Sequence, residues 1–139
     1  MHIKTIVKEI AKNFQYKADM FKFLDWWFIL REWDGKLVGD CEDFSLTAIW
    51  RLCNRNVLAF LWKVVITHQY RIYFCMTAKG ERHAVGYAQD LWFDNWTLEA
   101  LPKEEFLQKT GHKIKFFIPG PLIIINMILG ALVRNVKRT

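Results

Sequence analysis

Three side chains that together could carry out acyl transfer are spread over this sequence: Cys41, His83 and Asp94. A cysteine nucleophile needs a base within hydrogen-bond reach and a third group that orients the base, and these residues need not be close in sequence. Here the imidazole of His83 would withdraw the proton of the Cys41 thiol, and Asp94 would fix the tautomer of that imidazole. The residue types predict a thiol nucleophile if the fold brings the three together.

The residues around Cys41 predict where the nucleophile lies. Residues 39–43 are Gly-Asp-Cys-Glu-Asp, and residues 44–52 carry apolar side chains at helical spacing. A loop therefore becomes a helix at or beside the cysteine, and this helix runs to Cys53 or Asn54. The free amide N–H groups and the positive dipole end of a helix N-terminus lower the pKa of a thiol and can hold an oxyanion. We expect a depressed pKa for Cys41.

Two predicted strands position the base and the carboxylate. Residues 82–88 form a strand that places His83 on the same face as Val85 and Tyr87, because side chains alternate along a strand. After a turn, residues 91–96 form the next strand, which carries Asp94. This arrangement lets His83 and Asp94 meet at one edge of a sheet, with the helix of Cys41 packed against that sheet.

The other segments complete an α+β fold, in which N-terminal helices, including the nucleophile helix, pack on an antiparallel sheet. The remaining predicted elements are an amphipathic helix over 3–14, one or two short helices over 16–33 followed by a loop at 34–35, strands over 64–67 and 71–76, a short helix with Pro102 in its first turn and Gly111 at its end, an edge strand over 112–116, and an apolar helix over 122–133.

Composition limits the classes of function. The 139 residues are 53% hydrophobic and include seven tryptophans, so the chain is predicted to fold as one domain with some apolar surface for a partner, a membrane or a substrate. The net charge is +6 without an interleaved basic and aromatic run, and no nucleic acid is expected as a partner.

The N-terminus does not have the pattern of a signal peptide, which favours synthesis in a cytoplasm.

The remaining cysteines and histidines are the alternatives to this assignment. Cys53 lies within a predicted helix and Cys75 within an apolar strand, so both are interpreted as core residues. With three cysteines and no paired Cys/His spacing, neither a complete disulfide framework nor structural zinc is predicted. His68 is a rival base beside a strand end, and His112 is a weaker one.

The sequence resembles the transglutaminase-like cysteine peptidases of bacteria and their phages, within the papain-like superfamily. The matching segments are residues 39–44 (Gly-Asp-Cys-Glu-Asp-Phe), 83–85 (His-Ala-Val) and 94–95 (Asp-Asn), which cover about the middle half of the chain. The resemblance implies a Cys41-His83-Asp94 triad that cleaves or transfers a peptide or isopeptide amide through an acyl-thioenzyme. It also suggests phage origin and, in turn, association with a phage particle or a membrane.

Some members of this family bind calcium through carboxylates beside the catalytic cysteine, which here implicates Asp40 and Glu42. Oxygen ligands suit calcium, although such a site needs about six or more of them. The alternative is that Asp40, Glu42 and Asp43 cap the helix and complement its dipole. The capping interpretation is favoured because no further ligands are evident.

The C-terminal segment, residues 116–139, lies outside the family pattern, and the catalytic domain is assigned to residues 1–115. Residues 116–133 carry no charge, but Pro119, Gly120 and Pro121 leave an uninterrupted helix of about 12 or 13 residues, too short to cross about 30 Å of hydrocarbon. Leu122 to Val133 is predicted to be buried, to dock a protein partner or to lie on a membrane surface. A catalytically silent assembly module that docks through this helix, for example in a phage particle, is the alternative function.

Overall fold

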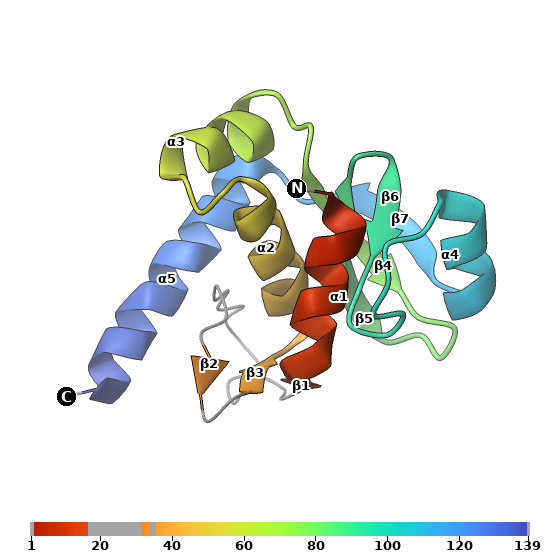
Figure 1. The fold of residues 1–139 in the computed structure, drawn as a ribbon, viewed down its shortest axis with the longest axis horizontal. Helices are drawn as coiled ribbons and strands as arrows, with labels where there is room; N and C mark the ends of the chain where they lie inside the picture. The colour runs from red at the N-terminus through yellow and green to blue at the C-terminus, as the bar shows by residue number, and fades with distance from the viewer. Residues whose placement is uncertain (1, 17–31, 34–35, 139) are drawn as a thin grey trace.

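A computed structural model describes residues 2–16, 32–33 and 36–138 of the chain. The helices and strands, in chain order, are α1 (Ile3–Asn13), β1 (Phe14–Tyr16), β2 (Glu32–Trp33), β3 (Lys36–Gly39), α2 (Cys41–Leu52), α3 (Val57–Phe60), the π-helix η1 (Leu61–Ile66), β4 (Arg71–Met76), β5 (Arg82–Ala88), β6 (Leu91–Phe93), α4 (Lys103–Thr110), β7 (Lys113–Phe117) and α5 (Gly120–Arg138). Figure 1 shows the helices gathered around a central sheet. The helices predicted within residues 16–33 and the loop at 34–35 lie largely outside the described residues.

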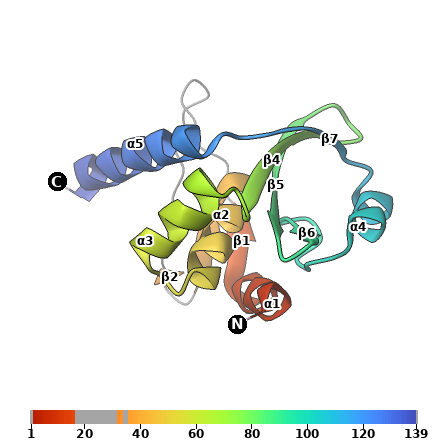
Figure 2. The same ribbon diagram turned by 90° about the horizontal axis from the view of Figure 1, so that it is seen from above.

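The main sheet is antiparallel and has the strand order β6-β5-β4-β7. Strands 71–76 and 82–88 are confirmed, and they pair so that Cys75 lies opposite His83. The edge strand predicted at 112–116 is also confirmed as β7, which pairs with β4 through a shift in register between Phe74 and Cys75. Figure 2 shows this sheet from above, with α4 on the side away from α2.

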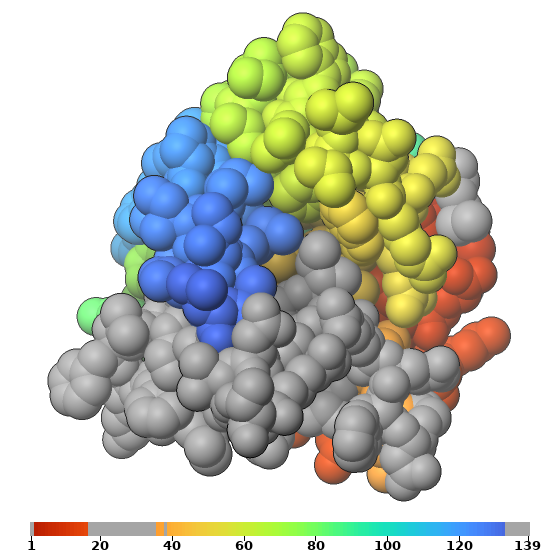
Figure 3. All heavy atoms as spheres, turned by 90° about the vertical axis from the view of Figure 1, so that its left-hand side faces the viewer, coloured from red at the N-terminus to blue at the C-terminus, as the bar shows by residue number. Residues whose placement is uncertain are grey.

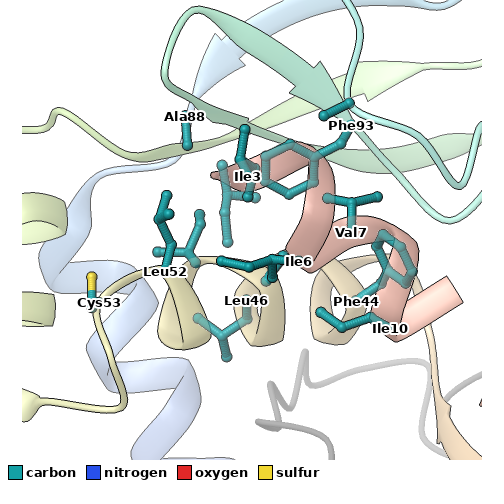
Figure 4. Packing of buried hydrophobic residues seen from close by; sticks show 14 of the residues in the cluster. Ile3, Ile6, Val7, Ile10, Phe44, Leu46, Leu52, Cys53, Ala88 and Phe93 are labelled. Carbon is teal, nitrogen blue, oxygen red and sulfur yellow. The ribbon is translucent and has the colours of Figure 1, made fainter. Parts of the chain in front are cut away.

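The main core lies between the sheet and the two helices α1 and α2. The predicted amphipathic stripe of α1 is confirmed, since Ile3, Ile6, Val7 and Ile10 are fully buried. They pack with buried residues of α2, such as Phe44, and with residues of the sheet (Figure 4). This packing fixes α2 against β5, the strand that carries His83.

A second cluster covers the other face of the sheet and includes Cys75, Val85, Trp92 and Phe106. Cys75 and Cys53 are both buried and unpaired, as predicted for core residues. The helix α4 supplies Phe106 and ends at Gly111, whose φ of 71° is a conformation that glycine adopts without strain. This end of α4 leads directly into His112.

The strand predicted at 64–67 is wrong, because residues 64–66 belong to the π-helix η1, which continues α3. The Asn56 side chain caps the segment by accepting a hydrogen bond from the Ala59 amide at 3.0 Å. Phe60 and Val64, four residues apart, are both buried, while Trp62 is exposed. Burial at helical spacing outweighs the β-propensity of the branched residues at 64–67.

A small second sheet with the order β1-β3-β2 was not predicted. In this sheet β1 and β3 are parallel, so Tyr16 lies opposite Gly39. The strand β3 ends at Gly39, one residue before the cap of α2. This sheet therefore determines where the chain enters α2.

The C-terminal helix α5 starts at Gly120, earlier than the predicted start at Leu122, and extends to Arg138. A Cβ at Gly120 would lie 2.7 Å from the carbonyl oxygen of Val64, so glycine allows the close approach of α5 to η1. Ile123 is buried in the main core. Within the described residues, no helix has the length and apolar character needed to cross a membrane.

Candidate active site

Asp94 is the centre of a buried hydrogen-bond network directly after β6. Its Oδ2 atom lies 2.8 Å from Nε2 of His83 and 2.9 Å from Nε2 of His112. Its Oδ1 atom accepts from the Trp96 amide at 3.1 Å, the Thr97 amide at 2.8 Å and the Thr97 hydroxyl at 3.0 Å. The bonds to Oδ1 form a turn, which explains why the strand predicted at 91–96 ends at Phe93.

This network keeps Asp94 ionised. Burial by itself raises the pKa of Asp94, but hydrogen bonds from His112, from His83 and from the Thr97 backbone outweigh it and hold the pKa well below its usual range. Asp94 is completely inaccessible to solvent. A buried carboxylate with five donors therefore acts only as an acceptor in this site.

The ionised carboxylate fixes the tautomer of both histidines. Because Asp94 can only accept, His83 and His112 must each donate from Nε2–H. A neutral His83 then has no proton on Nδ1, which carries a lone pair. The predicted pairing of His83 with Asp94 is thus present, with the orientation that leaves one ring nitrogen free to act as a base.

Aromatic rings hold His83 in place. His83 is the second residue of β5 and is buried, and its ring centroid lies 4.7 Å from that of His112 and 5.3 Å from that of Trp96. Trp96 also lies 4.8 Å from His112 and is itself exposed. Trp96 therefore covers the two histidines on the side that faces solvent.

Cys41 is the first residue of α2, as predicted, and is partly buried. The helix is capped by Asp40 and Asp43, whose carboxylates each accept a hydrogen bond at 3.3 Å from the backbone amide of the other residue. This confirms the capping role of Asp40 and Asp43. The backbone N–H of Ala84, the residue after His83, donates a hydrogen bond to the Cys41 sulfur.

The expected depression of the Cys41 pKa is wrong. Burial raises the pKa of Cys41 well above its ordinary value, and the carboxylates of Glu42 and Asp40 raise it further. The hydrogen bond from the Ala84 backbone lowers it, but not enough to compensate. Cys41 is therefore a protonated thiol at neutral pH, and its nucleophilic form requires a base.

Replacing Glu42 with glutamine is expected to make Cys41 more reactive. The change removes the carboxylate that contributes most, after burial, to the raised pKa. We expect alkylation of Cys41 by iodoacetamide near pH 8 to become about twofold to tenfold faster, as for the loss of one partly screened charge. Peptide mass spectrometry over a pH series gives the rate for each cysteine. Glu105→Gln, an exposed change on α4, is the matched control, and an equal effect of both variants would contradict the assignment.

The structure brings His83 and Asp94 into direct contact and places Cys41 beside the backbone of Ala84. Within the described part of the chain, the side chains of Cys41 and His83 do not hydrogen-bond to each other. Contacts between catalytic groups are often long before substrate binds and shorten in the complex. His83 and Asp94 are thus in contact with each other at the strand that also contacts the sulfur.

His112 is the residue of this site whose role the sequence did not indicate. It was interpreted only as a weak rival base, whereas its side chain is buried and shares Oδ2 of Asp94 with His83. Its position just before β7 puts it at the same end of the sheet as His83, because Lys113 pairs with Met76 and Cys75 pairs with His83. Only the pairing of β7 with β4, which are distant in sequence, reveals this.

The rival base His68 lies away from the site. It precedes Arg71, which pairs with Tyr87 at the far end of β5 from His83. Its ring packs against Phe117 at a centroid distance of 5.5 Å. Cys75, by contrast, is close to the site, but burial first and the charge of Asp94 second raise its pKa to about 12. Cys75 is thus an inert core thiol.

His83, Asp94 and His112 also have side chains of types that bind metal ions, and their ligand atoms lie within 4.8 Å of one another. However, both Nε2 atoms already bond to the same carboxylate oxygen, and the buried Nδ1 of His112 has no partner among the described residues. A metal-bound histidine usually donates its other ring N–H to an acceptor. We therefore assign this cluster to hydrogen bonding.

Helices packed on a four-stranded antiparallel sheet confirm the predicted α+β fold. Among solved structures, the chain is similar to LapG from Legionella pneumophila in its calcium-bound form. The TM-score is 0.52 at 18% sequence identity, and the match covers 84% of this chain and 65% of LapG. No protein-family model and no curated protein matches the sequence.

Proposed function

We propose that this protein is a transglutaminase-like thiol hydrolase that cleaves, or transfers, a peptide or isopeptide amide through Cys41, His83 and Asp94. The observation that carries the proposal is the 2.8 Å hydrogen bond between His83 Nε2 and Asp94, which fixes a histidine tautomer suited to a general base. The likeness to LapG supports the proposal at the level of the fold. The chain spans 65% of the LapG structure. The activity and the substrate of this chain are therefore proposals.

The first step of the proposed reaction transfers a proton. The Nδ1 lone pair of His83 takes the proton of the Cys41 thiol as the sulfur attacks the carbonyl carbon of the amide. The positive charge that forms on the imidazole is stabilised by the ionised Asp94. Because the pKa of Cys41 is raised, the enzyme would generate its thiolate only when His83 accepts the proton.

The tetrahedral oxyanion would form at the start of α2. The capping box engages the backbone amide of Asp43. The backbone amides of Cys41 and Glu42, the first two of the helix, are directed toward its N-terminal end. As the C–N bond breaks, the leaving amine takes the proton from His83 and a thioester remains on Cys41. Water, or an amine in the transfer reaction, then attacks the thioester and gives a proton to His83. As the C–S bond breaks, His83 passes this proton to the Cys41 thiolate, and the carboxylic acid or the new amide is released.

Calcium binding by Asp40 and Glu42 is a narrower proposal, supported by the calcium-bound form of LapG and by the oxygen chemistry of both side chains. The residues present do not complete such a site, because Asp40 is engaged in the cap of α2. Among the described residues, Asp40 and Glu42 are also not part of any three-residue ligand cluster. No catalytic step is assigned to calcium.

The proposed function is tested with p-nitrophenyl acetate as a simple acyl donor for the full-length chain. We expect a burst of p-nitrophenolate and an acetyl group on Cys41, located by peptide mass spectrometry. Cys41→Ser should abolish the burst, since serine lacks the nucleophilicity of the thiol at neutral pH. Cys53→Ser, a change at a buried thiol outside the site, is the matched control and should retain it. Acetylation of Cys53 or Cys75 in place of Cys41 would refute the proposal.

A catalytically silent assembly module with the same fold is the second candidate function. Two observations favour it: the raised pKa of Cys41, and the exposed apolar side chains of α5, including Leu122 and Ile128. The acyl-enzyme experiment separates the two candidates, because a silent module would show no burst that depends on both Cys41 and His83.

A further inference from the structure

Charge is distributed unevenly along this chain. Residues 44–80 and 106–139 contain no aspartate or glutamate, yet they hold eleven of the twenty lysines and arginines. The elements α3, η1, β4, β7 and α5 lie entirely within these two acid-free segments. All fourteen carboxylates are thus carried by the rest of the chain.

The exposed apolar side chains follow the same division. Ten of the thirteen large hydrophobic side chains that are exposed among the described residues belong to the acid-free segments. These ten are Val57, Leu58, Trp62, Ile66, Phe116, Phe117, Leu122, Ile125, Ile128 and Leu132. A surface that combines exposed apolar groups with an excess of positive charge is typical of proteins that lie on a membrane.

The helix α5 has one buried side and one exposed apolar side. Ile123 and Gly130 are buried, whereas Ile125, Ile128 and Leu132 are each more than half exposed. On a helix with 3.6 residues per turn, these three exposed residues lie on the side opposite the buried pair. One side of α5 therefore packs on the domain, and the other presents an aliphatic stripe.

The segment formed by α3 and η1 carries a second row of exposed apolar side chains. Leu58, Trp62 and Ile66 are 78%, 57% and 60% exposed, at successive intervals of four residues. The start of α5 packs on η1, since Gly120 approaches Val64 closely. Figure 3 shows α5, in blue, beside the yellow-green α3 region on one side of the molecule. We call Leu58, Trp62, Ile66, Ile125, Ile128 and Leu132 the exposed apolar rows.

We propose that the exposed apolar rows bind the surface of a membrane that contains anionic lipid. Leucine and isoleucine side chains enter the boundary between headgroups and acyl chains, and tryptophan is suited to that interface. The two acid-free segments that hold these residues carry eleven lysines and arginines, which would attract anionic headgroups, and no aspartate or glutamate that would repel them. The helices would lie on the surface of the bilayer.

Vesicle binding by the full-length chain tests this proposal. Cosedimentation is measured with phosphatidylcholine vesicles and with vesicles that also contain phosphatidylglycerol. We expect binding at least about tenfold stronger to the anionic vesicles, and most of this difference should disappear in 1 M salt, where charges are screened within about 3 Å. The double variant Ile125→Asp and Ile128→Asp should weaken binding about tenfold or more, since both side chains are exposed and contribute apolar contact.

The matched control is Leu98→Asp, which makes the same kind of change at an exposed residue outside the acid-free segments. Its positive φ is tolerated by aspartate, and circular dichroism checks that every variant is folded. Binding that is absent, insensitive to anionic lipid, or unchanged in the double variant overturns the proposal. Self-association that the double variant abolishes, without vesicle binding, would instead identify a protein interface and also overturn it. These outcomes are independent of acylation at Cys41.

Discussion

Replacing His83 with glutamine is expected to slow the acylation of Cys41 by about 10²- to 10⁴-fold, the usual contribution of a general base. Glutamine can still donate an N–H to Asp94, but it offers no nitrogen lone pair that accepts the thiol proton. The effect should be large because the pKa of Cys41 is raised and little thiolate exists without a base. Stopped-flow measurement of the p-nitrophenolate burst gives the rate directly.

The control for this prediction is His68→Gln, which changes the other histidine that the sequence offered as a strong candidate. His68 lies beside Phe117, near the end of β4 that is opposite the site. We expect this variant to acylate at the rate of the unmodified chain. If His68→Gln stopped acylation and His83→Gln did not, the base would have to be reassigned.

The parts of the fold that follow from local patterns were predicted correctly. The apolar spacing of α1 and the Asp-Cys-Glu-Asp start of α2 each specify a helix without reference to distant residues. The pairing of His83 with Asp94 was predictable for a similar reason. The strands β5 and β6 are joined by a short turn at Gln89 and Asp90, and consecutive strands commonly pair.

The errors concern properties that depend on tertiary packing. Residues 64–67 have high β-propensity, but burial of Phe60 and Val64 at helical spacing makes the segment helical. The pKa of Cys41 was predicted from the helix N-terminus alone, whereas burial by the sheet and two adjacent carboxylates raises it. Adjacent carboxylates are visible in a sequence, but the burial of a thiol is not.

The partner of His112 could not be found from sequence because it depends on a contact across 18 positions. A histidine just before an edge strand can face either a carboxylate or solvent. No local sequence pattern distinguishes these two cases. The consequence is physical: without His112, one lone pair of Asp94 Oδ2 lacks its donor, and the pKa of Asp94 is held down less strongly. His112 therefore belongs to the candidate site as a residue that positions Asp94.

Asp94→Asn is the second change expected to have a large effect, because it replaces the hydrogen-bond acceptor that faces the histidines with a donor. Three donors occupy the Oδ1 position, so the amide oxygen of asparagine would remain there and its NH₂ group would face His83 and His112. His83 would then have to accept through Nε2 and carry its proton on Nδ1. This tautomer presents no lone pair to Cys41, and acylation should fall by about 10³- to 10⁴-fold.

The same change should lower the free energy of unfolding at pH 7 by about 1.5–3 kcal/mol, the contribution of hydrogen bonds to a charged group. The folded-state pKa of Asp94 is depressed, so its stabilisation is present above the unfolded-state pKa near 3.9 and is lost as the pH falls through the folded-state value. The stability difference between the two proteins should therefore shrink in acid below about pH 4. Urea unfolding as a function of pH measures it.

His112→Gln is the matched control, because glutamine retains an N–H donor for Oδ2 while the carboxylate remains. It should leave His83 in the Nε2–H form, which the ¹⁵N chemical shifts of the ring report, and it should slow acylation much less than Asp94→Asn. An Asp94→Asn protein that acylates normally with His83 still in the Nε2–H form would show that the carboxylate does not set the tautomer. Since the 2.8 Å contact between His83 and Asp94 carries the proposed function, that result would remove its main support.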